Sequence, residues 1–272
     1  MKLVGSIAVL LIVAYWVTMN SLVIYRQREF AKQDRFRAGV TEFLGNELLR
    51  ERWLEIYRKN VKIGYTGCTY EKVFAAEGVE IRCDLDSRLN LDIPGSKLSV
   101  KIEGSLVLDG EMKPRSLRLD VTLADKLPMT LLGEQRGDQF ALKVRHADST
   151  APLLTLPREE LILGDGLVPS LPVSGFRVGD RYRISCFDPV KLSRSPVEVQ
   201  VLSKEVKEID GLLTEVFRLE TRFGDDTSPP GITSTSWMTA SGELLRQEFG
   251  PPLQDIVLRR QTRANAKRFF NR

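Results

Sequence analysis

The stretch ERWLEIYRKNVKIGYTGCTYEKV, Glu51 to Val73, decides how the rest of the chain is interpreted. Apolar and aromatic residues alternate with polar ones on both sides of a short polar turn. This is the pattern of two antiparallel strands joined by a hairpin. We interpret the stretch as the first hairpin of a large β-sheet that begins at Trp53.

The same alternation recurs further along the chain. The apolar residues at 98, 100, 102, 106 and 108 share one parity, with Gly104 as the single gap. A strand with this pattern has one apolar and one polar face. Turn motifs rich in Gly, Pro and Asp separate the runs, so the pattern predicts roughly a dozen strands. The other clear runs lie at 117–123, 140–144, 182–186, 197–201 and 217–223.

The N-terminal region precedes this sheet and has another character. Leu3 to Tyr25 is 23 residues without a charged side chain. As a helix it would rise about 34 Å, enough to cross a hydrocarbon core of about 30 Å. A cleaved signal peptide is the alternative, but this run is longer than the usual apolar region of about 7–15 residues. We predict an uncleaved single-pass anchor over residues 1–25.

Three further segments complete the predicted organisation. Residues 26–52 have apolar positions spaced by three and four, which predicts a juxtamembrane helix that either packs on the domain or lies on the bilayer. Residues 53–258 form the sheet, and the Pro- and Gly-rich insertion at 151–179 is a candidate cover. It separates two strand groups, either two domains or two halves of one curved sheet. Residues 259–272 hold six basic and no acidic residues and are predicted to be a tail.

The distribution of basic and acidic residues along the chain indicates which kinds of partner it can bind. The net charge is +4, but basic residues gather at 26–37 and 259–272, which leaves the body acidic. A nucleic-acid-binding domain would need a basic face on its folded part, so no nucleic-acid partner is expected. Basic ends beside a membrane span suit anionic lipid headgroups or an acidic partner surface, and a solvated tail is an equal alternative.

Residues with catalytic or metal-binding chemistry are scarce. His146 is the single histidine, which rules out sites built from several histidines. The segment LGDGLVPS at 163–170 lacks the lysine and the glycine spacing of phosphate-binding loops. We therefore predict no catalytic residues, no metal site, no cofactor and no enzymatic activity.

Three cysteines are present, and two of them fall on the arms of one predicted hairpin. Cys68 and Cys83 lie on either side of FAAEG. They could form a disulfide if their Cα atoms come within about 5.5–6 Å, and a compartment outside the cytosol would permit that bond. Two free thiols are the alternative. Cys186 has apolar parity and is predicted to be a small buried residue.

Several local motifs resemble one group of bacterial envelope domains. These motifs are WLEIYRKNVKIGYT at 53–66, FRVGDRYRISCFDP at 176–189, SWMTASGELLRQEF at 236–249 and TRANA at 262–266. In order and spacing they look like the lipoprotein-carrier-like half-barrels, including uncharacterised domains found beside transglutaminase-like modules. The resemblance implies a mainly β (α+β) fold: one curved antiparallel sheet, or half-barrel, covered by a helix and loop outside the cytoplasm.

Two functions remain open at this point. The first is a membrane-anchored, extracytoplasmic, non-catalytic domain that binds a lipid or another hydrophobic ligand in its concavity. The alternative is a structural or assembly subunit that contacts envelope-complex proteins. The residues expected to line the cavity would make an equally good dry core; they are Leu98, Val100, Ile102, Leu117, Leu119 and Val121.

The orientation in the inner membrane is the last prediction. Five basic residues just after the span favour a cytoplasmic C-terminal part, because positive charge is retained inside. The family resemblance implies the periplasmic side. A long folded domain can translocate despite such charges, so we expect a periplasmic domain.

Overall fold

The computed structural model of the chain describes residues 47–75, 78–93, 96–111, 113–123, 127–146, 149–158, 162–163, 175–188, 193–209, 211–224 and 232–268. The predicted anchor (1–25), residues 26–46 of the predicted juxtamembrane helix (26–52), and residues 159–161 and 164–174 of the predicted cover (151–179) lie outside these residues. Within the described ranges, no helix has the length and the apolar composition that a membrane span requires.

The predicted first hairpin is confirmed. β1 (Leu49–Arg58) and β2 (Val61–Ala75) pair antiparallel across Lys59 and Asn60, which have positive φ angles of 48° and 65°. Positive φ at both central positions is the geometry of a tight turn whose twist matches its strands. The further strands are β3 (Gly78–Ile93), β4 (Ser96–Asp109), β5 (Pro114–Leu123), β6 (Leu127–Arg136), β7 (Gln139–His146), β8 (Ser149–Pro157), β9 (Ile162–Leu163), β10 (Arg181–Asp188), β11 (Ser193–Ile209), β12 (Leu212–Phe223), β13 (Ile232–Met238), β14 (Leu244–Phe249) and β15 (Ile256–Gln261).

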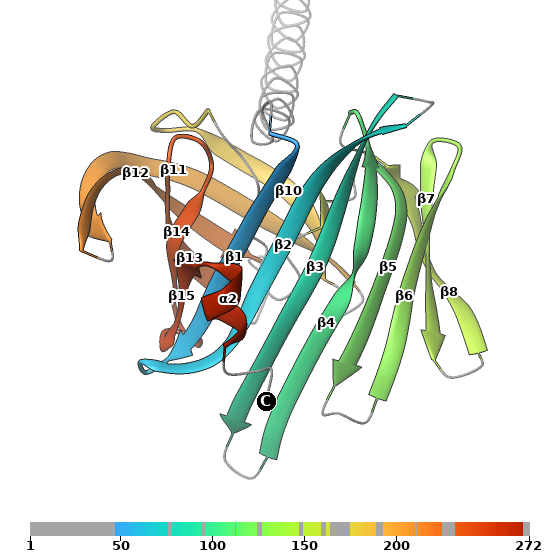
Figure 1. The fold of residues 1–272 in the computed structure, drawn as a ribbon, viewed down its shortest axis with the longest axis horizontal. Coiled ribbons are helices and arrows are strands. Elements are labelled where there is room, and N and C mark those ends of the chain that lie inside the picture. Colours follow the sequence, from blue (N-terminus) through green and yellow to red (C-terminus); the bar gives the residue numbers. More distant parts are fainter. Residues whose placement is uncertain are drawn as a thin grey trace, which may run out of the picture.

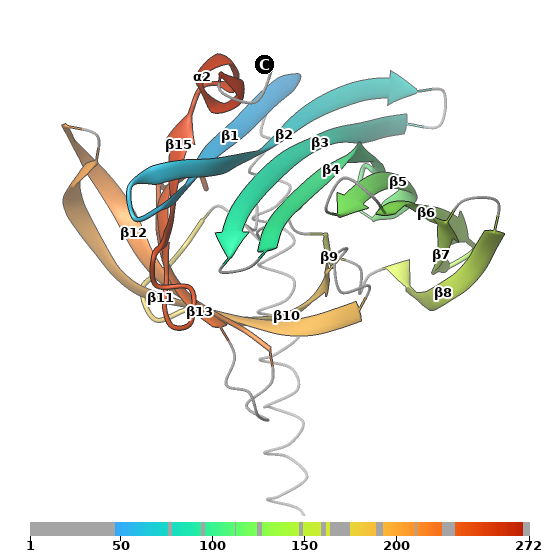
Figure 2. The ribbon, with the colours of Figure 1, turned by 90° about the horizontal axis from the view of Figure 1, so that it is seen from below.

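All of these strands belong to one 15-stranded sheet (Figure 1). Its order is β8-β7-β6-β5-β4-β3-β2-β1-β15-β14-β13-β12-β11-β10-β9. Neighbours pair antiparallel, except that β9 and β10 are parallel. β8 and β9 are the two edges, so the described strands curve without closing (Figure 2). A mainly antiparallel half-barrel is confirmed, with more strands than the dozen predicted.

The buried apolar face divides into two lobes. Strands β2 to β8 supply one hydrophobic cluster, which we call the β2–β8 lobe. β1, β10 to β15 and Phe176 supply the second, which we call the β10–β15 lobe. Leu89 on β3 packs against both clusters. Because strand pairing continues from one lobe to the other through β1 and β2, the lobes are two halves of one sheet.

The C-terminal residues are part of the fold. The predicted tail begins at residue 259, but β15 continues to Gln261 and pairs with β1 and β14. Helix α2 (Arg263–Lys267) then packs on the outer face of the sheet against Trp53 and Tyr65 (Figure 2). Net charge could not reveal this, because the partners of these basic residues lie far away in the sequence.

Basic side chains of this segment contact earlier strands. Lys267 forms an ion pair with Asp86 and lies 4.9 Å from the centre of the Trp53 ring. Arg263 lies 5.4 Å from the same ring centre. On the same face, a Cβ atom at Gly67 would meet the Trp53 ring at 2.1 Å, so glycine at this position lets the ring lie flat on β2.

Two other predicted boundaries also differ from the structure. The end of the predicted juxtamembrane helix, from Leu49, is already strand β1. The start of the predicted cover, up to Pro157, is edge strand β8, because its pairing with β7 continues to Gln139. Strands β1 and β8 therefore include residues that do not follow the alternation of apolar and polar side chains used to predict the boundaries.

Candidate ligand-binding face

The residues predicted to line a cavity lie on the inner face of the β2–β8 lobe. Leu98 belongs to β4, but its side chain lies outside the described part. The other five are each at most 4% exposed: Val100, Ile102, Leu117, Leu119 and Val121. Strand pairing sets Ile102 opposite Val121, as the common parity requires.

The side chains packed around these residues fill the interior of the β2–β8 lobe near Leu117. Phe140 on β7 is completely buried. A Cβ atom at Gly133 would lie 2.4 Å from the Phe140 ring and 3.0 Å from Leu117 Cβ, so the ring occupies the space that a side chain at 133 would need. Leu117 therefore lies in a filled core. Val100, by contrast, pairs with Leu89 at the junction of the two lobes.

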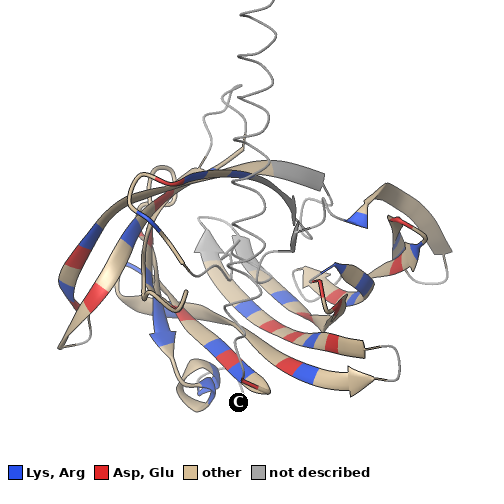
Figure 3. Ribbon diagram, turned by 90° about the horizontal axis from the view of Figure 1, so that it is seen from above, with Lys and Arg blue, Asp and Glu red and all other residues tan. Residues whose placement is uncertain are grey.

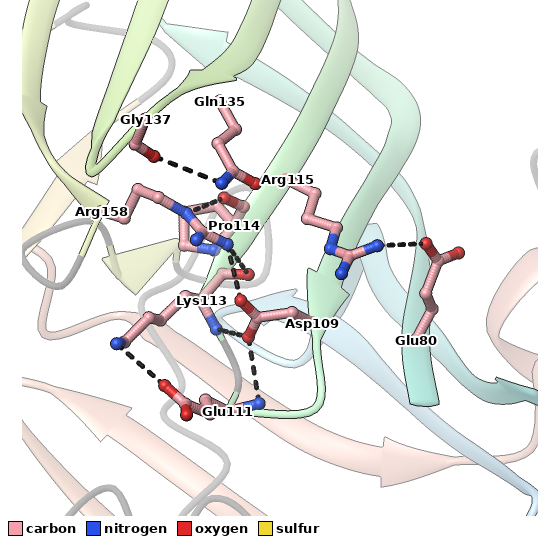
Figure 4. A network of polar contacts seen from close by, with 9 residues as sticks. All are labelled: Glu80, Asp109, Glu111, Lys113, Pro114, Arg115, Gln135, Gly137 and Arg158. Atoms are coloured by element: carbon pink, nitrogen blue, oxygen red, sulfur yellow. Dashed lines mark hydrogen bonds and ion pairs between the residues drawn. The ribbon is translucent and has the colours of Figure 1, made fainter. Parts of the chain in front are cut away.

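One end of the β2–β8 lobe is held by Arg158, which follows β8 (Figure 4). Its Nη2 donates to Asp109 Oδ2 at 2.6 Å, and its Nε donates to the Pro114 carbonyl oxygen at 2.9 Å. Asp109 Oδ1 in turn accepts from the backbone N–H groups of Glu111 and Lys113 at 3.0 and 2.9 Å. We call Arg158, Asp109 and Pro114 the Arg158 clasp.

The clasp connects parts of the sheet that are not neighbours. Asp109 and Pro114 flank the β4–β5 turn, and β5, β6 and β7 separate β4 from β8 in the sheet. Contact across this distance requires the lobe to curl strongly. The Arg158 and Asp109 side chains are only 11% and 17% exposed, a setting in which charge-assisted hydrogen bonds are stronger than at the open surface. The β2–β8 lobe is therefore a curled unit with a filled interior.

The two cysteines share the inner face but are not directly opposite each other. Cys68 pairs with Leu85, and Cys83 pairs with Tyr70, so the thiols are diagonal neighbours. Both are free and buried. The disulfide stays a prediction.

The contact between the thiols has an electrostatic consequence. A hydrogen bond with Cys68, together with burial, raises the pKa of the Cys83 thiol. Burial also raises the pKa of the Tyr70 hydroxyl, against the opposing effect of the Arg52 guanidinium. Arg52 is itself buried, and its Nη2 donates to the Tyr70 hydroxyl at 3.4 Å. Cys83 and Tyr70 therefore keep their protons at neutral pH.

A strip of polar side chains lies on the inner face of the β10–β15 lobe, and sequence reasoning missed it. We define this polar strip as Thr221, Ser234, Ser236 and Gln247, all buried. Gln247 Nε2 donates to Ser234 Oγ at 2.9 Å, while Gln247 Oε1 is buried and accepts no hydrogen bond from the described chain. The gap at 221 in the apolar run of β12 was the available signal. Such groups can hold the polar end of an amphiphilic ligand.

Charged residues do not form a second site in the described part of the chain. Lys and Arg are interspersed with Asp and Glu along the strands (Figure 3). His146 lies exposed at the end of β7, with Nδ1 3.0 Å from the Pro128 carbonyl oxygen. In the ranges listed above, no three His, Cys, Asp or Glu residues cluster so as to hold a metal ion.

Two solved structures are similar to this chain. The β-barrel-like protein of the domain of unknown function DUF1849 from Brucella abortus is 10% identical, covers 79% of this chain and 95% of its own, and has a TM-score of 0.47. A Bacteroides fragilis protein thought to be exported, with a YmcC-like fold, is 8% identical, covers 80% and 97%, and has a TM-score of 0.31. No family model and no curated protein matches the chain. The half-barrel is thus established by the chain's own strands, and the resemblance to lipoprotein carriers stays a hypothesis.

Proposed function

We propose that this chain is a membrane-anchored, non-catalytic domain outside the cytoplasm, and that it holds a lipid or another hydrophobic ligand on the inner face of its half-barrel. The observation that supports this most is the inner face itself. Apolar residues from both lobes line one side of a sheet whose edges, β8 and β9, do not pair. Leu89 is only partly buried and packs against both clusters, so an apolar ligand at this point would contact both lobes.

The anchor and the location rest on the sequence. The uncharged run from Leu3 to Tyr25 is long enough to span a bilayer. The motifs shared with envelope half-barrels favour the periplasmic side, against the basic residues that follow the span. The inner-membrane lipid would then be both the support of the domain and the nearest source of a ligand.

The two lobes do not support ligand binding equally. The interior around Leu117 and Phe140 is filled by the chain, and the Arg158 clasp holds that filled lobe in place. The ligand is therefore expected at the junction of the lobes, near Leu89 and Val100. From there the polar strip of the β10–β15 lobe offers partners for a headgroup.

A substitution at the junction tests this proposal. The delipidated full chain should take up a fluorescent fatty acid saturably, and Leu89→Trp should weaken that uptake severalfold because the larger side chain occupies the junction. Lys101→Trp is the matched control, because Lys101 lies on neighbouring strand β4 with its side chain on the outer face, paired with Glu103. No saturable uptake, or equal loss in both variants, would contradict ligand binding at the junction.

A second function, assembly with envelope proteins, is favoured by one observation. Val206, Leu212 and Leu213 are exposed at the end of the long β11–β12 hairpin (Figure 1). In that case Leu212→Ser with Leu213→Ser should abolish crosslinks from this hairpin to a partner in native membranes while leaving the thermal unfolding of the domain unchanged. Deleting residues 259–272 is not a suitable test, because it removes half of β15.

A further inference from the structure

Exposed apolar side chains gather at the end of the sheet where the described chain begins. Leu48 precedes β1 and Leu49 begins it, and Phe74 and Val79 are paired near the end of the β2–β3 hairpin. All four are exposed, Phe74 by 74%. We call them the apolar rim. Large apolar side chains that are exposed together, rather than singly, indicate a surface that meets something apolar.

The rim residues are held side by side by the sheet. Leu49 pairs with Glu71, and the backbone N–H of Lys72 donates to the Leu48 carbonyl oxygen at 2.8 Å. Phe74 follows Lys72 by two residues, so at about 3.3 Å per residue Phe74 lies roughly 7 Å beyond Leu48 along the hairpin. That length matches the depth of about 5–10 Å to which apolar groups enter the bilayer interface.

The position of the rim in the chain identifies its partner. Leu48 is connected through residues 26–47 to the uncharged run that ends at Tyr25, so the rim lies at the end of the domain nearest the proposed anchor. Five basic residues between 26 and 37 would contact anionic headgroups there. Val61, in contrast, is 65% exposed at the opposite end of β2, where it pairs with Arg58.

We infer that the apolar rim enters the interface of the bilayer that holds the anchor, with Phe74 as the deepest side chain. The rim then sets how the half-barrel stands on the membrane, with one end of its inner face against the lipid. This inference rests on the proposed membrane anchor and goes beyond it, because an anchor alone would leave the domain free to move away from the surface.

A nitroxide at each end of β2 tests the inference on the full chain. Phe74→Cys and Val61→Cys are labelled and reconstituted in vesicles of equal parts phosphatidylcholine and phosphatidylglycerol, with the labelled unsubstituted chain as a blank for the native cysteines. On transfer from detergent to vesicles, collisions of the label at 74 with oxygen should rise severalfold relative to collisions with a nickel chelate. The label at 61 should stay water-like.

Flotation of the same vesicles separates the two proposals. If the chain floats with the vesicles and the label at 74 remains in water, the rim inference is overturned and the anchor stands. If the chain does not float, the anchor fails and the rim inference fails with it. Both sites are exposed, so the cysteine variants should unfold at the same temperature as the unsubstituted chain, which confirms that they fold.

Discussion

The two lobes of this half-barrel are built from the same kind of strand but have different interiors. In the β2–β8 lobe the buried polar side chains of Thr66 and Ser87 are hydrogen-bonded to each other at 2.6 Å. The buried inner residues from β4 to β8 are apolar, and Phe140 packs into space left by Gly133. In the β10–β15 lobe the polar strip interrupts the apolar residues, and Gln247 Oε1 accepts no hydrogen bond from the described chain. Burying such groups lowers stability, so their presence indicates a role other than packing. The first lobe is a core, and the second has features of a binding surface.

Truncation of one aromatic residue in each lobe gives the largest expected effect. Phe140→Ala should lower the free energy of unfolding by about 3–5 kcal/mol, because it leaves a cavity in a filled core. Phe217→Ala should cost less, because Phe217 is 9% exposed and water can enter the space that its ring leaves. Denaturant unfolding followed by tryptophan fluorescence measures both. Equal losses would show that the lobes are packed alike.

The Arg158 clasp provides the next effect. Arg158→Ala should lower the free energy of unfolding by about 1–3 kcal/mol, because it leaves Asp109 and the Pro114 carbonyl without a partly buried donor. The free energy of unfolding of Arg158→Lys should lie between those of the unsubstituted chain and Arg158→Ala, because lysine keeps the charge but not the several N–H donors of the guanidinium. Arg136→Ala is the control: the ion pair of Arg136 with Glu134 is exposed, so its removal should change the free energy of unfolding by close to zero. A large decrease for Arg136→Ala would show that the Arg158 clasp is no stronger than an exposed ion pair.

Alkaline pH should act mainly on the β2–β8 lobe. The pKa of Cys83 is raised above its ordinary value of 9.0, and that of Tyr70 above 10.0. Below about pH 9 these two groups are protonated in both the folded and the unfolded chain, and their contribution to the free energy of unfolding is fully present. As the pH rises further, the unfolded chain loses these protons first, so stability falls by up to about 1.4 kcal/mol per pH unit and group. Cys83→Ala should give a flatter profile between about pH 9 and 10, and an unchanged slope would contradict this.

The smallest effect is expected on the outer face. Lys267→Met should lower the free energy of unfolding by about 1 kcal/mol, because it removes the ion pair with Asp86 and the contact with the Trp53 ring. Lys101→Met is the matched control, since Lys101 pairs with Glu103 at an exposed site. Thermal unfolding of the two variants compares them. If both behave alike, α2 adds no more than an ordinary surface contact.

Much of the sheet could be predicted from period-two alternation, because one face of each strand is buried. The runs at 98–108, 117–123 and 217–223 are strands, and the turn at Lys59 and Asn60 lies where the polar residues indicated. The common inner face of the candidate cavity residues could be predicted as well. Alternation indicates which side of a strand is buried, but it does not indicate whether a cavity lies on that side.

The remaining features depend on long-range contacts that alternation does not encode. The Arg158 clasp joins residues about fifty positions apart, and the basic residues after 258 find partners on β1 and β3. Sequence distance also could not show that Cys68 lies opposite Leu85 rather than Cys83, because a register shift of two residues keeps both cysteines on the same face. The sequence shows a polar residue at 221 within the apolar run of β12. Only the structure shows that this residue is buried on the inner face.

The pairing of β1 with β15 has a consequence for how this protein is made. Strand β1 waits for its second neighbour until β15, at Ile256–Gln261, has been synthesised. Strands β2 to β8 can assemble as successive local hairpins in the meantime, whereas the opposite half can join them only after β15 has emerged. A nascent chain interrupted before residue 256 would thus carry an unpaired edge of β1 at the centre of its sheet, which exposes it to quality-control proteases.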